Sequence, residues 1–466
     1  MTPIRLGATL GAALLATACA VGPRYQTPAT PPAVYQNAAP ATFVTTQSPE
    51  AAWWRAFEDP VLDDLVSRAL AGNLDLRIAG DRVRQARALF HDTQLDQAPR
   101  VTSEASYTDS REQDPGFTTT PLHTQTWQLG FDAAWEVDLF GHVRHTVEAA
   151  RAGTQAARDD LRDAQVTVAA EVARNYFELR GAQDRLVVAR RNLDTQRETL
   201  RLTQVRLDVG RGDAVDVASA QARLNATEAA IPTLITAEKR ANYRLAVLLG
   251  LRPGALDDTL QARDTATPPL INPLPIGDAS DLLRRRPDVQ AAERRLAGET
   301  ARVGVATADL FPRVKVSGFI GFLSGDFAHL TGASGQAWSV APTVSWPALD
   351  MGGAKARLHA QEASADAAAA SYDQTVLQAL EDLENALVAY RQQQAQVKSL
   401  ADQVAASRPA AELARIRYKE GTIDFLVLLD AERTLLASED DLTTAETGVN
   451  TAVVAVYKAL GGGWTA

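Results

Sequence analysis

Apolar residues recur every seven positions along one long stretch of the chain. Between Gly141 and Gly210 there is no proline, and the residues at this spacing are Val172, Leu179, Leu186, Leu193, Leu200 and Leu207. Six apolar residues at this spacing are typical of a coiled-coil seam rather than of the apolar stripe of a globular helix. A continuous helix over residues 142–209 would be roughly 100 Å long. With the turn Gly210-Arg211-Gly212 and a returning helix to Gly250, this stretch is predicted to form an arm or a wall.

The same pattern occurs twice. A shift of 211 positions aligns the two halves of the chain without gaps. The aligned pairs include Trp127 with Trp338, Trp135 with Trp346, Gly141 with Gly352, Arg206 with Arg417, Gly210 with Gly421 and Gly250 with Gly461. We therefore predict two repeats, 61–250 and 280–461, each with a helix, two strands and two long helices joined by a turn. A proline-rich linker at 251–279 joins the repeats, an extended tail at 19–60 precedes them, and residues 462–466 follow.

Two segments alternate between apolar and polar residues as strands do. Residues 127–137 place Trp127 and Trp135 on one face, and the equivalent segment in the second repeat places Trp338 and Trp346 on one face. Eight residues of strand span roughly 26 Å, close to the apolar height of a transmembrane barrel between its aromatic girdles. With strands at 101–109 and 314–323, each repeat would form one hairpin. A soluble sandwich with one wet face is the alternative.

Four strands cannot close a barrel. An open strand edge in lipid is costly, so a membrane-spanning sheet of this kind requires several copies of the chain. Two copies would give eight strands and a filled barrel, whereas three would give twelve and room for a channel. The pattern alone does not choose between two and three.

The N-terminal residues have the features of an export signal. Arg5 precedes a short apolar core, and small residues lead to Cys19, the only cysteine in the chain. Either residues 1–18 are removed by ordinary secretory cleavage, or they form a lipoprotein signal that ends before an acylated Cys19. The second alternative is favoured by the position of Cys19, although the residue three before it is Ala16 rather than leucine. Because residue 20 is not aspartate, the resemblance to lipoproteins favours the outer membrane.

Net charge excludes one class of partner. The chain has a formal charge of −10 and a pI near 5.3, and it shows no basic stripe, so a nucleic-acid binder is not expected. No catalytic constellation and no cofactor-binding motif is apparent. His142 and His145 lie three apart with no evident third ligand, so we expect a surface pair and no metal site.

Several motifs resemble TolC-like outer-membrane efflux proteins of the OprM and NodT lipoprotein branch. They cover nearly the whole mature chain in order, at residues 53–62, 69–76, 135–141 (Trp-Glu-Val-Asp-Leu-Phe-Gly), 285–289 (Arg-Arg-Pro-Asp-Val), 311–313, 417–433 and 457–464. The resemblance implies a mostly α-helical mixed α+β membrane protein: a homotrimer with a 12-stranded β-barrel continuous with a 12-helix periplasmic α-barrel. Such ducts supply no energy, and they dock onto a periplasmic adaptor protein and an inner-membrane pump, commonly of the resistance-nodulation-division type.

The resemblance also suggests site residues. Leu426 and Asp430 match the family's closed periplasmic constriction, and Tyr418 would hold the helix pair closed; a simply solvated carboxylate is the alternative for Asp430. The residues expected at the adaptor-contacting tips are Gly210, Arg211, Gly421 and Thr422, although the turn geometry alone accounts for the glycines. The predicted function is a passive exit duct for drugs or other small toxic solutes. Protein secretion, metal efflux and a lipid-anchored periplasmic coiled-coil scaffold without a pore remain alternatives.

Overall fold

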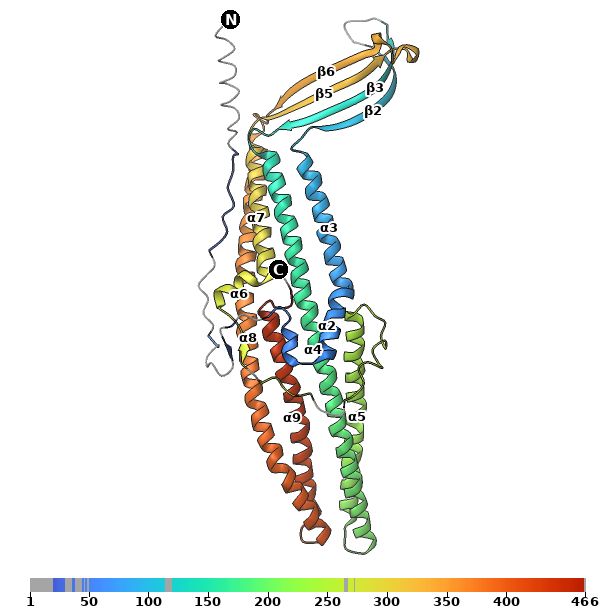
Figure 1. Ribbon diagram of the computed structural model, residues 1–466, viewed down its shortest axis with the longest axis vertical. Helices are drawn as coiled ribbons and strands as arrows, with labels where there is room; N and C mark the ends of the chain where they lie inside the picture. The colour runs from blue at the N-terminus through green and yellow to red at the C-terminus, as the bar shows by residue number, and fades with distance from the viewer. Residues whose placement is uncertain are drawn as a thin grey trace. The chain divides into compact units, whose positions relative to one another are not determined.

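The computed structural model describes residues 20–29, 36–37, 44–45, 47, 50–113, 120–263, 267–271 and 273–464 (Figure 1). The chain divides into two compact units. Unit 1 draws on Met1–Ala29, Asp81–Arg158 and Gln290–Gln374, and unit 2 on Thr30–Gly80, Asp159–Val289 and Thr375–Ala466. Each unit therefore contains segments from both predicted repeats.

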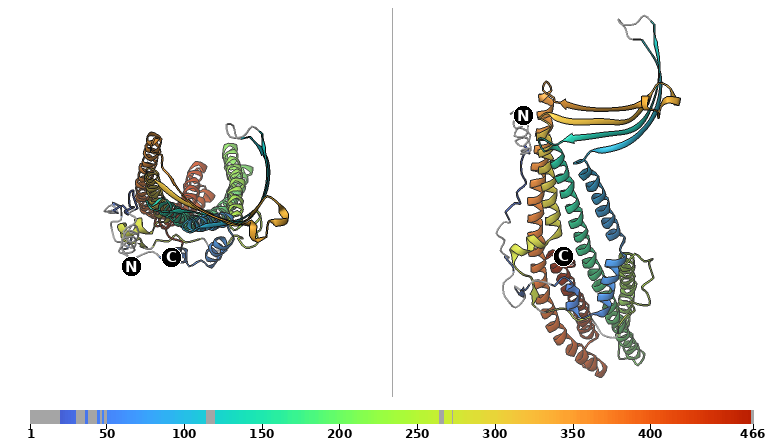
Figure 2. Two further views of the ribbon diagram at one scale, coloured as in Figure 1. Left: turned by 90° about the horizontal axis from the view of Figure 1, so that it is seen from above. Right: turned by 45° about the horizontal axis from the view of Figure 1, so that its top comes forward.

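Unit 1 contains a four-stranded antiparallel sheet in the order β2-β3-β5-β6. The strands are β2 (Arg100–Glu112), β3 (Leu122–Val137), β5 (Arg313–Ser324) and β6 (Gln336–Ser345). Short 3₁₀ turns, η2 (Phe327–His329) and η3 (Ala333–Gly335), connect β5 to β6. Seen from above, the sheet is strongly curved (Figure 2). The two predicted hairpins are confirmed, and β2 and β3 extend beyond the predicted bounds.

One face of this sheet is apolar and open to solvent. Trp127 lies opposite Tyr107, Trp135 opposite Val316, and Ile320 opposite Trp338, so these side chains share a face. Many of the large apolar side chains on this face are exposed, among them Phe131 57%, Ile320 66%, Trp338 78%, Val340 64% and Val344 66%. Such a contiguous apolar surface requires an apolar environment or a partner.

Two helices, rather than the one predicted, precede each hairpin. They are α2 (Pro60–Gly72) and α3 (Leu74–Leu95) before the first, and α6 (Ala279–Arg285) and α7 (Pro287–Ala308) before the second. Asn73 makes the first break because its side chain accepts hydrogen bonds from the main chain of Asp75 and Leu76 and so caps α3. At the second break, Pro287 disfavours helical geometry at Arg286.

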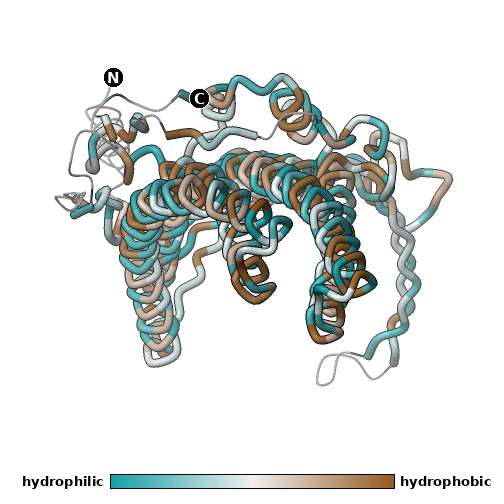
Figure 3. Tube along the Cα trace, turned by 90° about the horizontal axis from the view of Figure 1, so that it is seen from below, coloured by the Kyte–Doolittle hydropathy of each residue, from teal (hydrophilic) through white to brown (hydrophobic). Residues whose placement is uncertain are grey.

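Four long helices continue from the hairpins: α4 (His142–Asp208), α5 (Ala214–Leu248), α8 (Met351–Glu420) and α9 (Phe425–Ala459). The predicted continuous helix after Gly141 is thus confirmed to within one residue. The heptad positions of α4 are buried from Val172 to Leu193 and partly buried at Leu200 and Leu207. Those of α8 are all buried: Leu383, Tyr390, Val397, Val404, Ala411 and Tyr418. Polar and apolar residues alternate around each long helix in Figure 3, as expected when only a narrow seam is buried.

Two buried carboxylates of α9 lie in this seam of unit 2. Glu432 is 4% exposed and accepts hydrogen bonds from Thr199 of α4 and Arg415 of α8, each at 2.9 Å. One heptad further on, Glu439 is 6% exposed and binds Arg191 at 2.5 Å and Arg408 at 2.9 Å. Each carboxylate therefore joins α9 to both α4 and α8.

The linker between the repeats packs into the core of unit 2. Its Leu274–Pro275 segment (β4) pairs in parallel with Val44–Thr45 (β1) of the tail. Leu256, Leu260, Leu274 and Ile276 are buried in the main core of unit 2. In the tail, the 3₁₀ helix η1 (Trp53–Phe57) buries Trp53, which stacks on Tyr457 at 5.1 Å. The extended tail predicted at 19–60 is wrong at 53–57, where burial of Trp53 and Trp54 stabilises a 3₁₀ helix.

No helix in the described part of the chain is long and apolar enough to cross a membrane.

The turns at the ends of α4 and α8 have the same backbone geometry. Gly210 and Gly421 have φ of 71° and 78°. Each accepts the left-handed conformation that ends a helix in a Schellman motif, with bonds from Gly210 N to Leu207 O and from Arg211 N to Arg206 O. The bonds from Gly421 to Tyr418 and from Thr422 to Arg417 repeat this pattern.

Gly210→Ala should therefore lower stability, although a Cβ there meets nothing within 4 Å. The left-handed backbone penalises alanine by about 1–2 kcal/mol. Gly153→Ala is the matched control, because this glycine lies inside α4 and a Cβ there also meets nothing within 4 Å. It should raise stability by about 0.5–1 kcal/mol. Thermal midpoints at one heating rate measure both; a shift of the same sign for both variants would contradict the explanation.

Asp163 lies in a cavity of about 420 Å³ in unit 2, also lined by Arg286, Asp288 and Lys458. Burial, reinforced by the charge of Asp288, raises its pKa from 3.8 to about 6. Because the folded-state pKa is raised, the protonated carboxyl stabilises the fold below pH 3.8, and this contribution is lost as the pH rises through about 6.

Asp163→Asn should accordingly raise the free energy of unfolding at pH 7 by about 2–3 kcal/mol, and the gain should shrink towards pH 4. Denaturation measured at both pH values tests this. Asp402→Asn, which alters an exposed carboxyl of α8, is the control and should change little at either pH. A gain for Asp163→Asn that did not depend on pH would exclude the titration of this carboxyl as the cause.

Candidate functional site

The ends of the four long helices enclose a small apolar cluster in unit 2. We call it the tip cluster; its buried members are Ala220 of α5, Ala414 and Tyr418 of α8, and Phe425 and Leu428 of α9. Tyr418 is 2% exposed, and its ring lies 5.6 Å from that of Phe425. The predicted gate residue Tyr418 is therefore a packing centre between α8 and α9.

Arg206 connects this cluster to α4. Its guanidinium lies over the Tyr418 ring, 4.4 Å from the ring centroid, and donates a hydrogen bond to the main-chain oxygen of Tyr418. A second bond, of 3.4 Å, goes to the carbonyl of Arg211 in the first turn. One side chain thus fastens the end of α4 to the end of α8.

Arg206 is not among the site residues predicted from the sequence. The repeat aligns Arg206 with Arg417, the residue before Tyr418. This alignment does not predict that Arg206 contacts Tyr418. Only the packing of α4 against α8 brings the guanidinium to the ring.

The polar groups at the tip cluster are partly removed from water. Burial raises the pKa of the Tyr418 hydroxyl, against the opposing effect of the Arg206 charge. Burial also raises the pKa of Asp216, and the charge of Asp213 adds to this effect. The Tyr418 oxygen is buried without a hydrogen-bond partner among the described residues, so ring packing and the Arg206 contact hold Tyr418 in place.

Leu426 and Asp430 lie outside the tip cluster. Leu426 is 69% exposed, and the Asp430 side chain is 68% exposed. They are four residues apart on α9 and so lie on one side of the helix. Asp430 accepts a bond of 2.8 Å from Arg433 of the same helix. Within one chain, the structure therefore does not bring these two residues together with Tyr418.

The two turns differ in their side chains. Asp213 caps α5 by accepting a hydrogen bond from Val215 N at 2.9 Å, whereas Asp424 makes no side-chain cap at α9. Thr422 instead adds a hydroxyl bond to Arg417 O at 3.0 Å. Arg211 and the neighbouring Val209 and Val215 are exposed around the first turn, where they are available for a contact.

The four tryptophans of the sheet fall into two pairs. Trp135 and Trp346 donate their indole N–H groups to Gln97 O and Leu310 O, which follow α3 and α7. Trp127 packs against Tyr107 at 4.2 Å and Phe327 at 4.9 Å, and Trp338 is the most exposed of the four. The pairs therefore lie towards opposite ends of the apolar face, as expected from the sequence.

The prediction of a surface histidine pair was wrong for His145. Its side chain is 6% exposed, because Val21 of the tail covers it: Nε2 lies 2.9 Å from Val21 O and Nδ1 lies 2.9 Å from Glu148. Among the described residues, no group of three or more His, Cys, Asp or Glu side chains could hold a metal ion. Cys19, the predicted lipidation site, lies outside the described residues.

Comparisons with known proteins agree with this architecture. The family model "Outer membrane efflux protein" matches residues 65–251 and 279–462. Nodulation protein T of Rhizobium leguminosarum bv. trifolii is 31% identical over 436 residues, covering 93% of this chain and 92% of its own length. Outer membrane protein OprJ of Pseudomonas aeruginosa is 30% identical over 459 residues, covering 97% and 94%. The solved structure of the outer-membrane channel OprN superposes with a TM-score of 0.92 at 48% identity, covering 96% of this chain and 100% of that one. The chain belongs to the family of TolC-like outer membrane efflux proteins.

Proposed function

We propose that this chain is one protomer of a homotrimeric outer-membrane exit duct that exports drugs or other small toxic solutes. The observation that carries this proposal is the open apolar face of the four-stranded sheet. Its edge strands β2 and β6 each lack a second neighbour among the described strands. Copies of the chain would pair these edges, and three copies would make twelve strands around a pore. Several relatives are named as outer membrane proteins of efflux pumps, for example the toluene efflux pump outer membrane protein TtgC of Pseudomonas putida.

The internal repeat supports a tunnel wall of equivalent helix pairs. Arg197 pairs with Glu228 between α4 and α5, and Arg408 pairs with Glu439 between α8 and α9. Both residues of the first pair lie 211 positions before those of the second. In three copies, the two helix pairs per chain would supply the twelve helices of a periplasmic tunnel.

The remaining parts of the proposal follow from this arrangement. Residues 1–18 would be a signal peptide, and acylated Cys19 would anchor the chain to the outer membrane. The exposed side chains at the turns around Gly210, Arg211, Gly421 and Thr422 would meet a periplasmic adaptor, which in turn would connect to an inner-membrane pump of the resistance-nodulation-division type. Such a duct needs no cofactor and catalyses no reaction.

Leu426 and Asp430 would narrow the periplasmic end. Because both side chains are exposed within one chain, three copies of α9 could present a leucine ring and a carboxylate ring to the pore. The contact of Arg206 with Tyr418 would hold the ends of α4 and α8 together in the narrow state.

Leu426→Ala combined with Asp430→Ala should increase single-channel conductance in planar bilayers, because both rings become wider. The matched control is Leu377→Ala with Glu381→Ala, an exposed leucine and carboxylate four residues apart on α8. This control should leave conductance at the parent value. Equal conductance of the parent and the Leu426/Asp430 variant would remove both residues from the gate.

The export function is tested by deleting the gene in the native host and restoring it on a plasmid. The deletion should raise susceptibility to drugs and organic solvents, and the restored parent chain should reverse this change. A defect confined to metal tolerance or to protein secretion would reassign the duct to that cargo. A monomer released from the membrane by removal of its lipid, with no conductance in bilayers, would instead support the scaffold alternative.

A further inference from the structure

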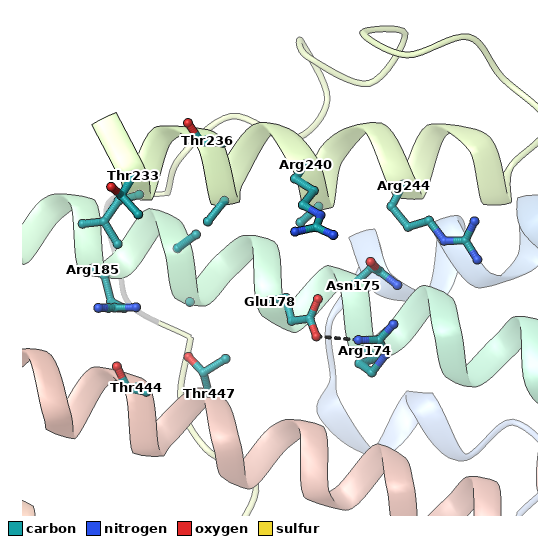
Figure 4. A pocket seen from close by; sticks show the side chains of 15 residues that line it. Arg174, Asn175, Glu178, Arg185, Thr233, Thr236, Arg240, Arg244, Thr444 and Thr447 are labelled. Carbon is teal, nitrogen blue, oxygen red and sulfur yellow. Dashed lines mark hydrogen bonds and ion pairs between the residues drawn. The ribbon is translucent and has the colours of Figure 1, made fainter. Parts of the chain in front are cut away.

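A cavity of about 910 Å³ lies in unit 2 between α4, α5 and α9 (Figure 4). Helix α4 forms its base, α5 and α9 line its sides, and no residue of unit 1 takes part. At the base, Gly181 allows a close approach of α9, since a Cβ there would come within 2.3 Å of the Thr447 hydroxyl. The cavity is large enough for a drug-sized molecule.

Four arginines line this cavity, and two of them are already neutralised. Arg174 of α4 binds Glu171 at 2.8 Å and Glu178 at 2.7 Å. Arg185 binds Asp440 through two nitrogens, at 2.7 Å and 2.9 Å. These ion pairs fix the positions of both guanidinium groups and neutralise their charge.

Arg240 and Arg244 of α5 are different. Neither forms a hydrogen bond or an ion pair with any described residue. They are four residues apart, so they extend from the same side of α5, and both line the cavity (Figure 4). Two like charges at this spacing repel one another, and an anion between them would relieve the repulsion.

The rest of the lining suits a molecule with an apolar body. Leu234 and Ala241 of α5 and Ala182 of α4 are buried at 7%, 5% and 7% exposure. Thr233 and Thr444 also line the cavity. Next to this apolar surface lie the exposed side chains of Arg240 and Arg244.

We infer that this cavity binds organic anions, with a carboxylate or sulfonate held by Arg240 and Arg244 and an apolar body against Leu234, Ala182 and Ala241. Guanidinium groups suit such oxyanions because each can donate two parallel hydrogen bonds. The inference rests on the proposed duct, because it names one class of solute that the duct would carry.

The test uses the full-length protein in lipid nanodiscs and two probes of the same shape, 2-naphthalenesulfonate and neutral 2-naphthalenemethanol. Calorimetry should show saturable binding of the sulfonate and much weaker binding of the alcohol. Arg240→Gln with Arg244→Gln should weaken sulfonate binding at least about tenfold, and Arg240→Lys with Arg244→Lys should retain part of the affinity. Arg82→Gln with Arg87→Gln, which removes two exposed arginines of α3, is the control and should bind like the parent.

Equal binding of the two probes, or unchanged sulfonate binding by the double glutamine variant, would overturn the anion site. Conductance of the same preparations in planar bilayers separates this outcome from failure of the duct. A conducting parent with no sulfonate binding would remove the site and keep the duct, whereas sulfonate binding without conductance would keep the site and remove the duct.

Discussion

The lengths of α4 and α8 impose the main constraint on this protein. Most of the stability of helices in proteins comes from tertiary packing, so helices of 67 and 70 residues need packing partners along the length of their apolar seams. In the C-terminal part of each helix, that seam is narrow and repeats every seven residues. Such a seam is buried by packing against other helices that have an apolar seam, and α5 and α9 are such helices within the chain.

Apolar heptads alone leave the axial register between neighbouring helices poorly defined, because sliding one helix by seven residues restores the same apolar contacts. The buried carboxylates Glu432 and Glu439 remove this ambiguity. Each requires partners from both α4 and α8 at one height, and leaving a buried charge unpaired costs about 3–5 kcal/mol. The charged residues of the seam therefore set register, while the leucines and valines provide most of the cohesion.

Much of this architecture could be predicted from the sequence because it repeats or has a fixed period. The seam, the alternation around Trp127 and Trp338, and the left-handed glycines at Gly210 and Gly421 each follow from local rules. The contacts that could not be predicted are those between segments distant in sequence. Arg206 reaches Tyr418 over 212 positions, and His145 is buried because Val21 covers it. Likewise, Leu274 of the linker pairs with Val44 of the tail.

The two turns show how structural and functional requirements can be separated. Their backbones are the same, and the left-handed conformation explains why glycine stands at position 210 and at position 421 without any reference to a partner. The side chains around these glycines are not required by the turn. Only the first turn has an aspartate cap and an exposed arginine, and only the second has a buried tyrosine that the opposite helix pair contacts. Any distinction that an adaptor or a gate makes between the two helix pairs would therefore come from these side chains, with Arg206 joining both turns and the exposed Arg211 present at the α4–α5 turn.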